Sequence, residues 1–204
     1  MQSAVVTPQV LLWDFGDTLV DERWMLRAPT GCADWASAWR EVMTTHADDW
    51  NVGRVSEAEV FRALHDRTGL GVDVIEHHAA ECCRSIAFHP VAWRVATERR
   101  RPQALVTVNP DLFVARVAPT YDLAAHFDAV VVSYQEGTDD KTALCEIALV
   151  RLGYTGPRAG ALLVDNREDL TDAWRRSGGA SYWYRGDAAF EADLPTLFGP
   201  GSGG

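Results

Sequence analysis

One short segment constrains the fold of this chain more than any other: the apolar residues 10–13 run directly into Asp14. Gly16 follows two positions later, where the chain is expected to turn sharply. A short apolar run closed by a turn is typical of a buried strand in a parallel α/β sheet. Such sheets bind ligands at the carboxyl ends of their strands, where Asp14 would lie. Alone the pattern is weak, because an acid after a strand is often only a turn former.

Three later segments follow in a matching order and supply further polar groups. A carboxylate can attack phosphorus, additional carboxylates bind Mg²⁺ through oxygen, and lysine and hydroxyl groups stabilise charge on phosphate oxygens. Together the segments therefore contain the groups needed to handle a phosphoryl group. They are Thr107 and Asn109 at the end of an apolar run from residue 104, Lys141 at the start of a helical stretch, and Asp165 and Asp169 after the apolar residues 160–164.

The order and spacing of these residues resemble the haloacid dehalogenase (HAD) superfamily of hydrolases, from about residue 10 to about residue 185. The resemblance implies a Mg²⁺-dependent phosphatase that acts on a small phosphorylated molecule through an aspartyl-phosphate intermediate. It also implies a role for each matching residue: Asp14 as nucleophile and metal ligand, the Gly16 carbonyl as metal ligand, Thr107 and Lys141 as phosphate-binding catalytic residues, and Asp165 with its partner Asp169 as metal-binding acids.

The chain departs from typical phosphatases of this family at Gly16. They carry an aspartate there, two positions after the nucleophile, which serves as general acid and base. Asp17 stands one place further on, and we expect it to cap the turn or face solvent. A positioned general acid contributes roughly 10²–10⁴-fold in rate. Without that acid, the enzyme should prefer activated phosphates, whose leaving group departs without a proton, and its rate should depend steeply on the leaving group. Alternatively, it borrows an acid from its cap or its substrate.

The rest of the chain predicts a Rossmann-like α/β core with an inserted helical cap. Apolar spacing is helical from residue 20 to 99, which matches a C1-type cap, and His89-Pro90 marks the return toward the core. Residues 1–19 and 100–198 are assigned to the core and 199–204 to a flexible tail. Five strands, mostly parallel, are expected at residues 10–13, 104–108, 128–133, 160–164 and 180–184.

The cap is expected to determine substrate specificity. Glu22, Arg23 and Trp24 follow the nucleophile loop, where the cap entry can overhang the site. We predict substrate contacts for Arg23, Trp24, Thr18 and Asn109. Five tryptophans lie in or beside the cap, and we expect most of them to pack its core: Trp24, Trp35, Trp39, Trp50 and Trp93.

Two local patterns in the cap are interpreted structurally rather than functionally. Residues 56–59 form a capping-box signature at the start of a helix. His77, His78 and Glu81 stand at helical spacing, but no zinc-site pattern surrounds them, so we expect a solvated helix face.

Composition limits the partners. The 204 residues carry a formal net charge of −10, which argues against nucleic acid and anionic membranes. No apolar stretch approaches membrane-spanning length, and no secretory signal is evident. The spacing of the four cysteines is not that of a disulfide framework, so we expect reduced thiols at Cys32, Cys82, Cys83 and Cys145, the last of them in the core. We expect a cytoplasmic protein that is either a monomer or a homodimer.

Two other functions stay open. A 2-haloacid dehalogenase would use the same carboxylate to attack carbon without a metal, but the acids at Asp165 and Asp169 favour phosphate chemistry. A catalytically weakened binding or regulatory module would agree with Gly16, but the other groups are intact.

Overall fold

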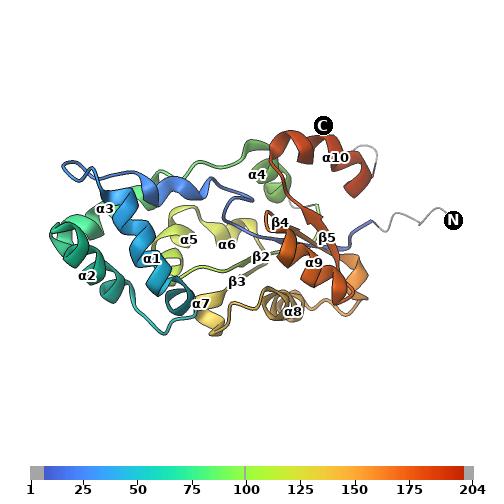
Figure 1. Cartoon of the computed structure of the whole chain (residues 1–204). Coiled ribbons are helices and arrows are strands. Elements are labelled where there is room, and N and C mark those ends of the chain that lie inside the picture. Colours follow the sequence, from blue (N-terminus) through green and yellow to red (C-terminus); the bar gives the residue numbers. More distant parts are fainter. Residues whose placement is uncertain (1–6, 99, 200–204) are drawn as a thin grey trace.

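The computed structural model describes residues 7–98 and 100–199 (Figure 1). Within that part of the chain, five parallel strands form one sheet in the order β3-β2-β1-β4-β5. The α/β architecture and the five strands are confirmed, each within about a residue of its predicted position. The strands are β1 Val10–Trp13, β2 Gln103–Thr107, β3 Ala129–Val132, β4 Ala161–Asp165 and β5 Ala180–Trp183.

Strand β1 lies in the middle of the sheet because its side chains are apolar on both faces, and all four are buried. Since successive side chains point to opposite faces, Leu12 packs with one core cluster and Leu11 and Trp13 with the other. From β1 the chain continues to β2 and β3 on one side and later to β4 and β5 on the other. The carboxyl end of β1 is therefore a topological switch point, the usual place for a ligand site.

Helices cover both faces of the sheet (Figure 1). Helices α8 and α9 pack on the face that includes Leu12, and α10 lies on the opposite side with Phe190 against Trp13. The core segments outside the sheet are α4 Pro90–Thr97, the π-helical turn η2 Phe113–Val117, α5 Ala118–Thr120, α6 Leu123–His126, α7 Ser133–Glu136, α8 Lys141–Arg151, the 3₁₀ turn η3 Arg158–Gly160, α9 Glu168–Arg176 and α10 Asp187–Phe198.

The insertion between β1 and β2 is helical, as predicted, and lies at one end of the molecule in Figure 1. Its helix α2 begins with the predicted capping box, in which Ser56 and Glu59 exchange hydrogen bonds between side chain and backbone. Its apolar faces pack on one another around Trp35, Phe61 and Ile75. The elements of the insertion are the 3₁₀ turn η1 Glu22–Leu26, α1 Trp35–Asn51, α2 Glu57–Thr68 and α3 Val72–Arg84.

The two chain segments that join this cap to the core lie beside each other. Val20 forms an antiparallel bridge with Phe88, and the His89 amide donates to the Leu19 carbonyl at 2.9 Å. Helix α4, which follows at once, packs against α10 of the core. The chain thus meets the core near His89-Pro90. The cap bounds of residues 20–99 stay a prediction, and residue 99 lies outside the described residues.

Other expectations concern the chain as a whole. No helix among the described residues is both long and apolar enough to cross a membrane. The four cysteines are buried and free, and Cys145 lies in the core as predicted. Apart from Gly199, the predicted tail at 199–204 lies outside the described residues.

Candidate active site

Asp14 and Lys141 form a buried ion pair at the carboxyl end of β1. The backbone of Asp14 continues the pairing of β1 with β4, since its amide donates to the Val164 carbonyl at 2.9 Å. Lys141 is the first residue of α8, whose amino end is capped by the Asp140 side chain. Its Nζ donates to Asp14 Oδ1 at 2.6 Å and to the Val106 carbonyl at 2.7 Å. Three strands and one helix thereby fix the ammonium against the carboxylate.

Asp165 completes the buried charge cluster from the end of β4. Its Oδ1 accepts a hydrogen bond from the Arg167 amide at 2.8 Å. Its Oδ2 lies 3.0 Å from Lys141 Nζ but accepts no hydrogen bond. The Lys141 ammonium pairs with this oxygen, but two buried carboxylates share that one cation. Buried carboxylates are costly unless fully paired, so the cluster is suited to a second cation.

Thr18 ties the nucleophile loop to the end of β4. Its hydroxyl donates to Asp14 Oδ2 at 3.1 Å and accepts from the Asn166 amide at 3.0 Å. Each oxygen of the Asp14 carboxylate therefore accepts a hydrogen bond, Oδ2 from Thr18 and Oδ1 from Lys141. The hydroxyl of Thr18 orients the Asp14 carboxylate.

Thr107 and Asn109 lie at the end of the neighbouring strand β2. The Asn109 side-chain amide donates to the Thr107 hydroxyl at 2.6 Å. Thr107 is buried, whereas Asn109 borders a cavity. The structure therefore brings five of the predicted site residues to one edge of the sheet: Asp14, Thr18, Thr107, Lys141 and Asp165. Asn109 lies beside them, at the border of the cavity.

The charges in this cluster are strongly coupled. Burial raises the pKa of Asp14 to about 6, against the opposing effect of Lys141 and with a further contribution from Asp165. Burial alone would lower the pKa of Lys141, but Asp14 and Asp165 outweigh it and raise the pKa above its usual value. Lys141 therefore stays charged at neutral pH. The ionised form of Asp14 is the less favourable one in the folded protein, because burial outweighs its attraction to Lys141.

Three predicted or considered residues lie apart from this cluster. Arg23 pairs with Asp21, and its side chain is 79% exposed. Asp169 pairs with Arg167 at 2.7 Å, and its side chain is 65% exposed. No group of three acidic, histidine or cysteine side chains suited to a metal occurs in the described ranges, so Asp169 as a metal ligand stays a prediction. Asp17 is exposed and accepts a hydrogen bond from the Glu22 amide, which confirms its expected turn-capping role.

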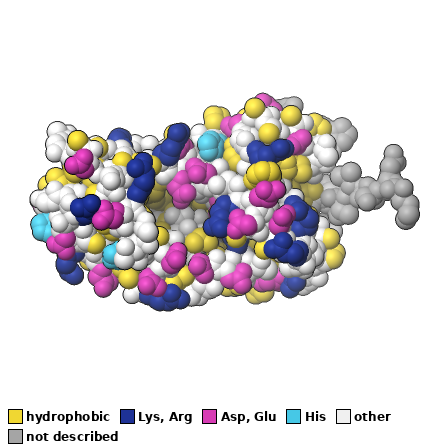
Figure 2. All heavy atoms as spheres, in the orientation of Figure 1, with side chains coloured by type: hydrophobic (Ala, Val, Ile, Leu, Met, Phe, Trp, Pro, Cys, Tyr) yellow, Lys and Arg dark blue, Asp and Glu magenta, His cyan; other side chains and the backbone are white. Residues whose placement is uncertain are grey.

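A cavity of about 310 Å³ opens between the cap and the end of β2. In Figure 2 the surface is hollowed between the cap and the core, and acidic side chains gather beside the hollow. Most of the cavity wall is apolar or aromatic, including the predicted Trp24. The lining residues are Glu22, Trp24, Met25, Leu26, Trp39, Met43, Ala47, Trp50, Asn51, Val108, Asn109, Pro110 and Leu112.

Glu22 is the residue of this site that was not selected from the sequence. Its exposed surface faces the cavity, yet the surrounding protein removes enough water to raise the pKa of its carboxyl to about 7, helped by the charges of Asp14 and Asp17. The only signal in the sequence was its place just after the nucleophile loop.

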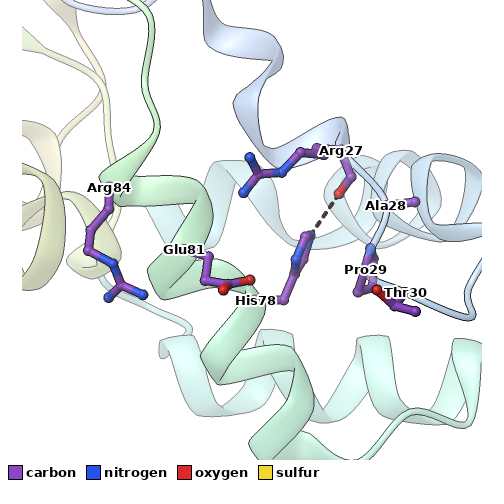
Figure 3. A pocket seen from close by; sticks show the side chains of 7 residues that line it. All are labelled: Arg27, Ala28, Pro29, Thr30, His78, Glu81 and Arg84. Carbon is purple, nitrogen blue, oxygen red and sulfur yellow. Dashed lines mark hydrogen bonds between the residues drawn. The ribbon is translucent and has the colours of Figure 1, made fainter.

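A second cavity, of about 490 Å³, lies on the cap itself and is lined by none of the clustered residues (Figure 3). His78 points into it and donates through Nε2 to the Arg27 carbonyl at 2.7 Å. His78 is buried, so the solvated face predicted for it is wrong, because the chain entering α1 covers the ring. His77 and Glu81 do form an exposed pair four residues apart, at 3.5 Å.

Comparison with solved structures places the fold. A HAD family enzyme from Bacteroides thetaiotaomicron is similar with a TM-score of 0.65 and 13% identity, over 88% of this chain and 94% of that one. That enzyme is also known in complex with magnesium and inorganic phosphate, at a TM-score of 0.63, 12% identity and 88% and 95% coverage. L-2-haloacid dehalogenase from Xanthobacter autotrophicus is similar with a TM-score of 0.59 and 18% identity, over 85% and 76% of the chains. No protein-family model and no curated protein sequence matches significantly.

The chain therefore has the fold of the HAD superfamily, and its helical insertion is consistent with a C1-type cap. The resemblance stated from the sequence is confirmed at the level of the fold.

Proposed function

We propose that this protein is a Mg²⁺-dependent phosphatase that acts through an aspartyl-phosphate on Asp14. The observation that carries the proposal is the buried cluster at the ends of β1 and β4, in which Lys141 contacts the carboxylates of both Asp14 and Asp165. A single lysine between two carboxylates leaves the cluster with excess negative charge, which is a suitable environment for a cation. A carboxylate fixed in this way is a competent nucleophile toward phosphorus.

The residues present fit a magnesium ion. The buried Asp165 Oδ2 accepts no hydrogen bond and supplies one oxygen, and we assign the Asp14 carboxylate and the Gly16 carbonyl as the others. Mg²⁺ is commonly bound by only one or two carboxylates together with water and substrate phosphate, so a third acid is not required. When bound, the ion would neutralise charge on the phosphate oxygens.

The remaining residues have separate tasks in the proposed reaction. Asp14 attacks phosphorus, and Lys141 stabilises negative charge on the transferred group. Thr107 and Asn109 bind phosphate oxygens at the end of β2, and Thr18 keeps the Asp14 carboxylate oriented. Water then hydrolyses the aspartyl-phosphate, which restores the carboxylate.

The cavity suggests the kind of substrate. Its walls contain Trp24, Trp39 and Trp50, with Asn109 toward the phosphate-binding end. Pockets with mostly apolar walls and few polar groups bind small molecules with an apolar or aromatic part. We infer a small organic phosphate of this type, encountered in the cytoplasm, and assign no role to nucleic acid or membrane.

Phosphate release tests the proposal. The protein is incubated with acyl, aryl and alkyl phosphates in Mg²⁺ or EDTA, alongside Asp14→Asn. We expect release that needs Mg²⁺ and is lost in the variant. Chloride release from 2-chloropropionate in EDTA would instead indicate a dehalogenase, and no release from any compound would favour a binding module.

A further inference from the structure

The space beside Gly16 is filled by a carboxyl group from another residue. A Cβ built on Gly16 would lie 2.5 Å from Glu22 Oε1 and 2.6 Å from its Cδ. The backbone at Gly16 has no positive φ, so its conformation does not demand glycine. The three atoms nearest to such a Cβ all belong to the Glu22 carboxyl, so a side chain at position 16 would have to displace it.

Glu22 is held in this place by its backbone. It is the first residue of η1, whose amino end is capped by Asp21, and its amide donates to Asp17 Oδ1 at 2.9 Å. The chain just before it is fixed by the bridges that Val20 makes to Gly16 and Phe88. The start of η1 is thereby tied to the nucleophile loop on one side and to the returning chain segment on the other.

The carboxyl group of Glu22 is also free to act. Among the described residues, no hydrogen bond or ion pair engages it, although Arg23 and Asp21 beside it are fully paired with each other. Glu22 lines the cavity that Asn109 borders at the end of β2. A substrate in that cavity would meet this carboxyl on the side of the site where position 16 lies.

We propose that Glu22 is the general acid and base of this enzyme, supplied by the cap entry in place of a side chain at position 16. As Asp14 attacks phosphorus, the bond from phosphorus to the leaving oxygen breaks, and that oxygen takes the proton of the Glu22 carboxyl. In the second step the Glu22 carboxylate takes a proton from water while the water oxygen attacks phosphorus. The bond to Asp14 then breaks, and inorganic phosphate leaves.

This inference rests on the proposed phosphatase function, and the leaving group separates the two. We compare wild type, Glu22→Gln and the exposed cap variant Glu41→Gln on acetyl phosphate, p-nitrophenyl phosphate and an alkyl phosphate, all with Mg²⁺. We follow release of the leaving group within a single turnover, because this rate reports the first step alone. In Glu22→Gln we expect this rate to fall roughly 10²–10⁴-fold for the alkyl phosphate and to change little for acetyl phosphate, whose leaving group needs no proton. Hydrolysis of the intermediate, in which Glu22 acts as base, should slow equally for all three compounds. Glu41→Gln should match wild type throughout.

Transfer of the acid back to position 16 provides a second test. We expect Gly16→Asp to restore part of the alkyl phosphate activity when it is added to Glu22→Ala, which empties the space that the carboxyl fills. We also expect the two positions to be coupled in Tm, because contacting residues are not additive. Gly16→Ala should lower Tm in the wild type and lower it less in a Glu22→Ala background. This readout does not depend on activity.

The outcomes separate the two ideas. An equal loss of the first-step rate for all three phosphates in Glu22→Gln would mean a metal-binding or structural role and would overturn the acid–base assignment, while leaving the phosphatase proposal intact. Additive Tm changes would show that the Glu22 carboxyl does not occupy the space beside Gly16, and would also overturn it. No phosphate release by the wild type from any of the three compounds would overturn both.

Discussion

At the scale of single residues, the site buries charged groups at a cost in stability that a purely structural core would avoid. Asp14 and Asp165 are both buried, and one lysine contacts them both. Burying a charge is costly unless it is fully paired, and here one carboxylate oxygen accepts no hydrogen bond. Such strain is common at functional sites, where stability and activity compete.

Replacement of Asp14 should therefore stabilise the metal-free protein in a pH-dependent way. The pKa of Asp14 is raised from 3.8 to about 6 in the folded state, so its protonated form favours folding. This contribution is fully present below about pH 4 and is lost as the pH rises through about 6. Asp14→Asn cannot ionise, so its Tm relative to wild type should rise between pH 4 and 6 and stay level above that.

The measurement is thermal unfolding of both proteins in EDTA across this pH range. The exposed Asp48, on the cap helix α1, gives a matched control as Asp48→Asn, which should show no such change. A Tm difference that is constant with pH would contradict the assigned effect of burial on Asp14.

The residues at strand ends could be predicted from sequence because an apolar run fixes where its strand ends. Asp14, Thr107 and Asp165 were located in this way. Glu22 could not be selected over Arg23, since both follow the same loop and only the three-dimensional path of η1 decides which side chain turns toward the site. Asp169 was placed by spacing alone, which cannot show that Arg167 engages it.

At the scale of elements, the strands and the longer helices follow from local sequence signals. The capping box at Ser56 confirms the start of α2. The Ser56 hydroxyl accepts a hydrogen bond from the Glu59 amide, and the Glu59 carboxylate accepts one from the Ser56 amide. The short turns η2 and α6 carry no comparable signal, because so few residues give no periodicity. They are set by packing, since η2 contacts α3 and α5, and α6 contacts α5 and β3.

Loss of this cap should be measurable. We expect Ser56→Ala to lower the free energy of unfolding by about 1 kcal/mol, because it removes a partner from the first amides of α2. Urea denaturation checks the value. Ser37→Ala, at an exposed position within α1, is the comparison and should be close to neutral; an equal loss in both variants would argue against a role for the box.

At the scale of the whole molecule, the cap is attached to the core by polar contacts as well as by its two connecting segments. Asp111, which follows β2, accepts from the Trp50 indole at 2.6 Å and from the Glu57 amide at 3.0 Å. Ser133 donates to the Asn51 carbonyl at 2.6 Å. These contacts cluster beside the cavity, so they determine how the cap sits over the site. No sequence pattern predicted them, because they join residues more than fifty positions apart.

Asp111→Ala should loosen the cap. The variant leaves the amide at the start of α2 without its partner, and hydrogen bonds to charged groups contribute about 1.5–3 kcal/mol. We expect faster hydrogen exchange in the second half of α1 and the start of α2, with the strands unchanged. Asp48→Ala serves as the control, and unchanged exchange in both cap helices would show that Asp111 does not hold the cap.

The most direct test of the account is to trap the phosphorylated intermediate. The protein is mixed with Mg²⁺ and acetyl phosphate, quenched in acid within the first turnover, and analysed by intact and peptide mass spectrometry. We expect one added phosphoryl group, located on Asp14 and missing in Asp14→Asn and in EDTA. Phosphate release without any such adduct, or an adduct on another residue, would contradict the assignment of Asp14 as the nucleophile.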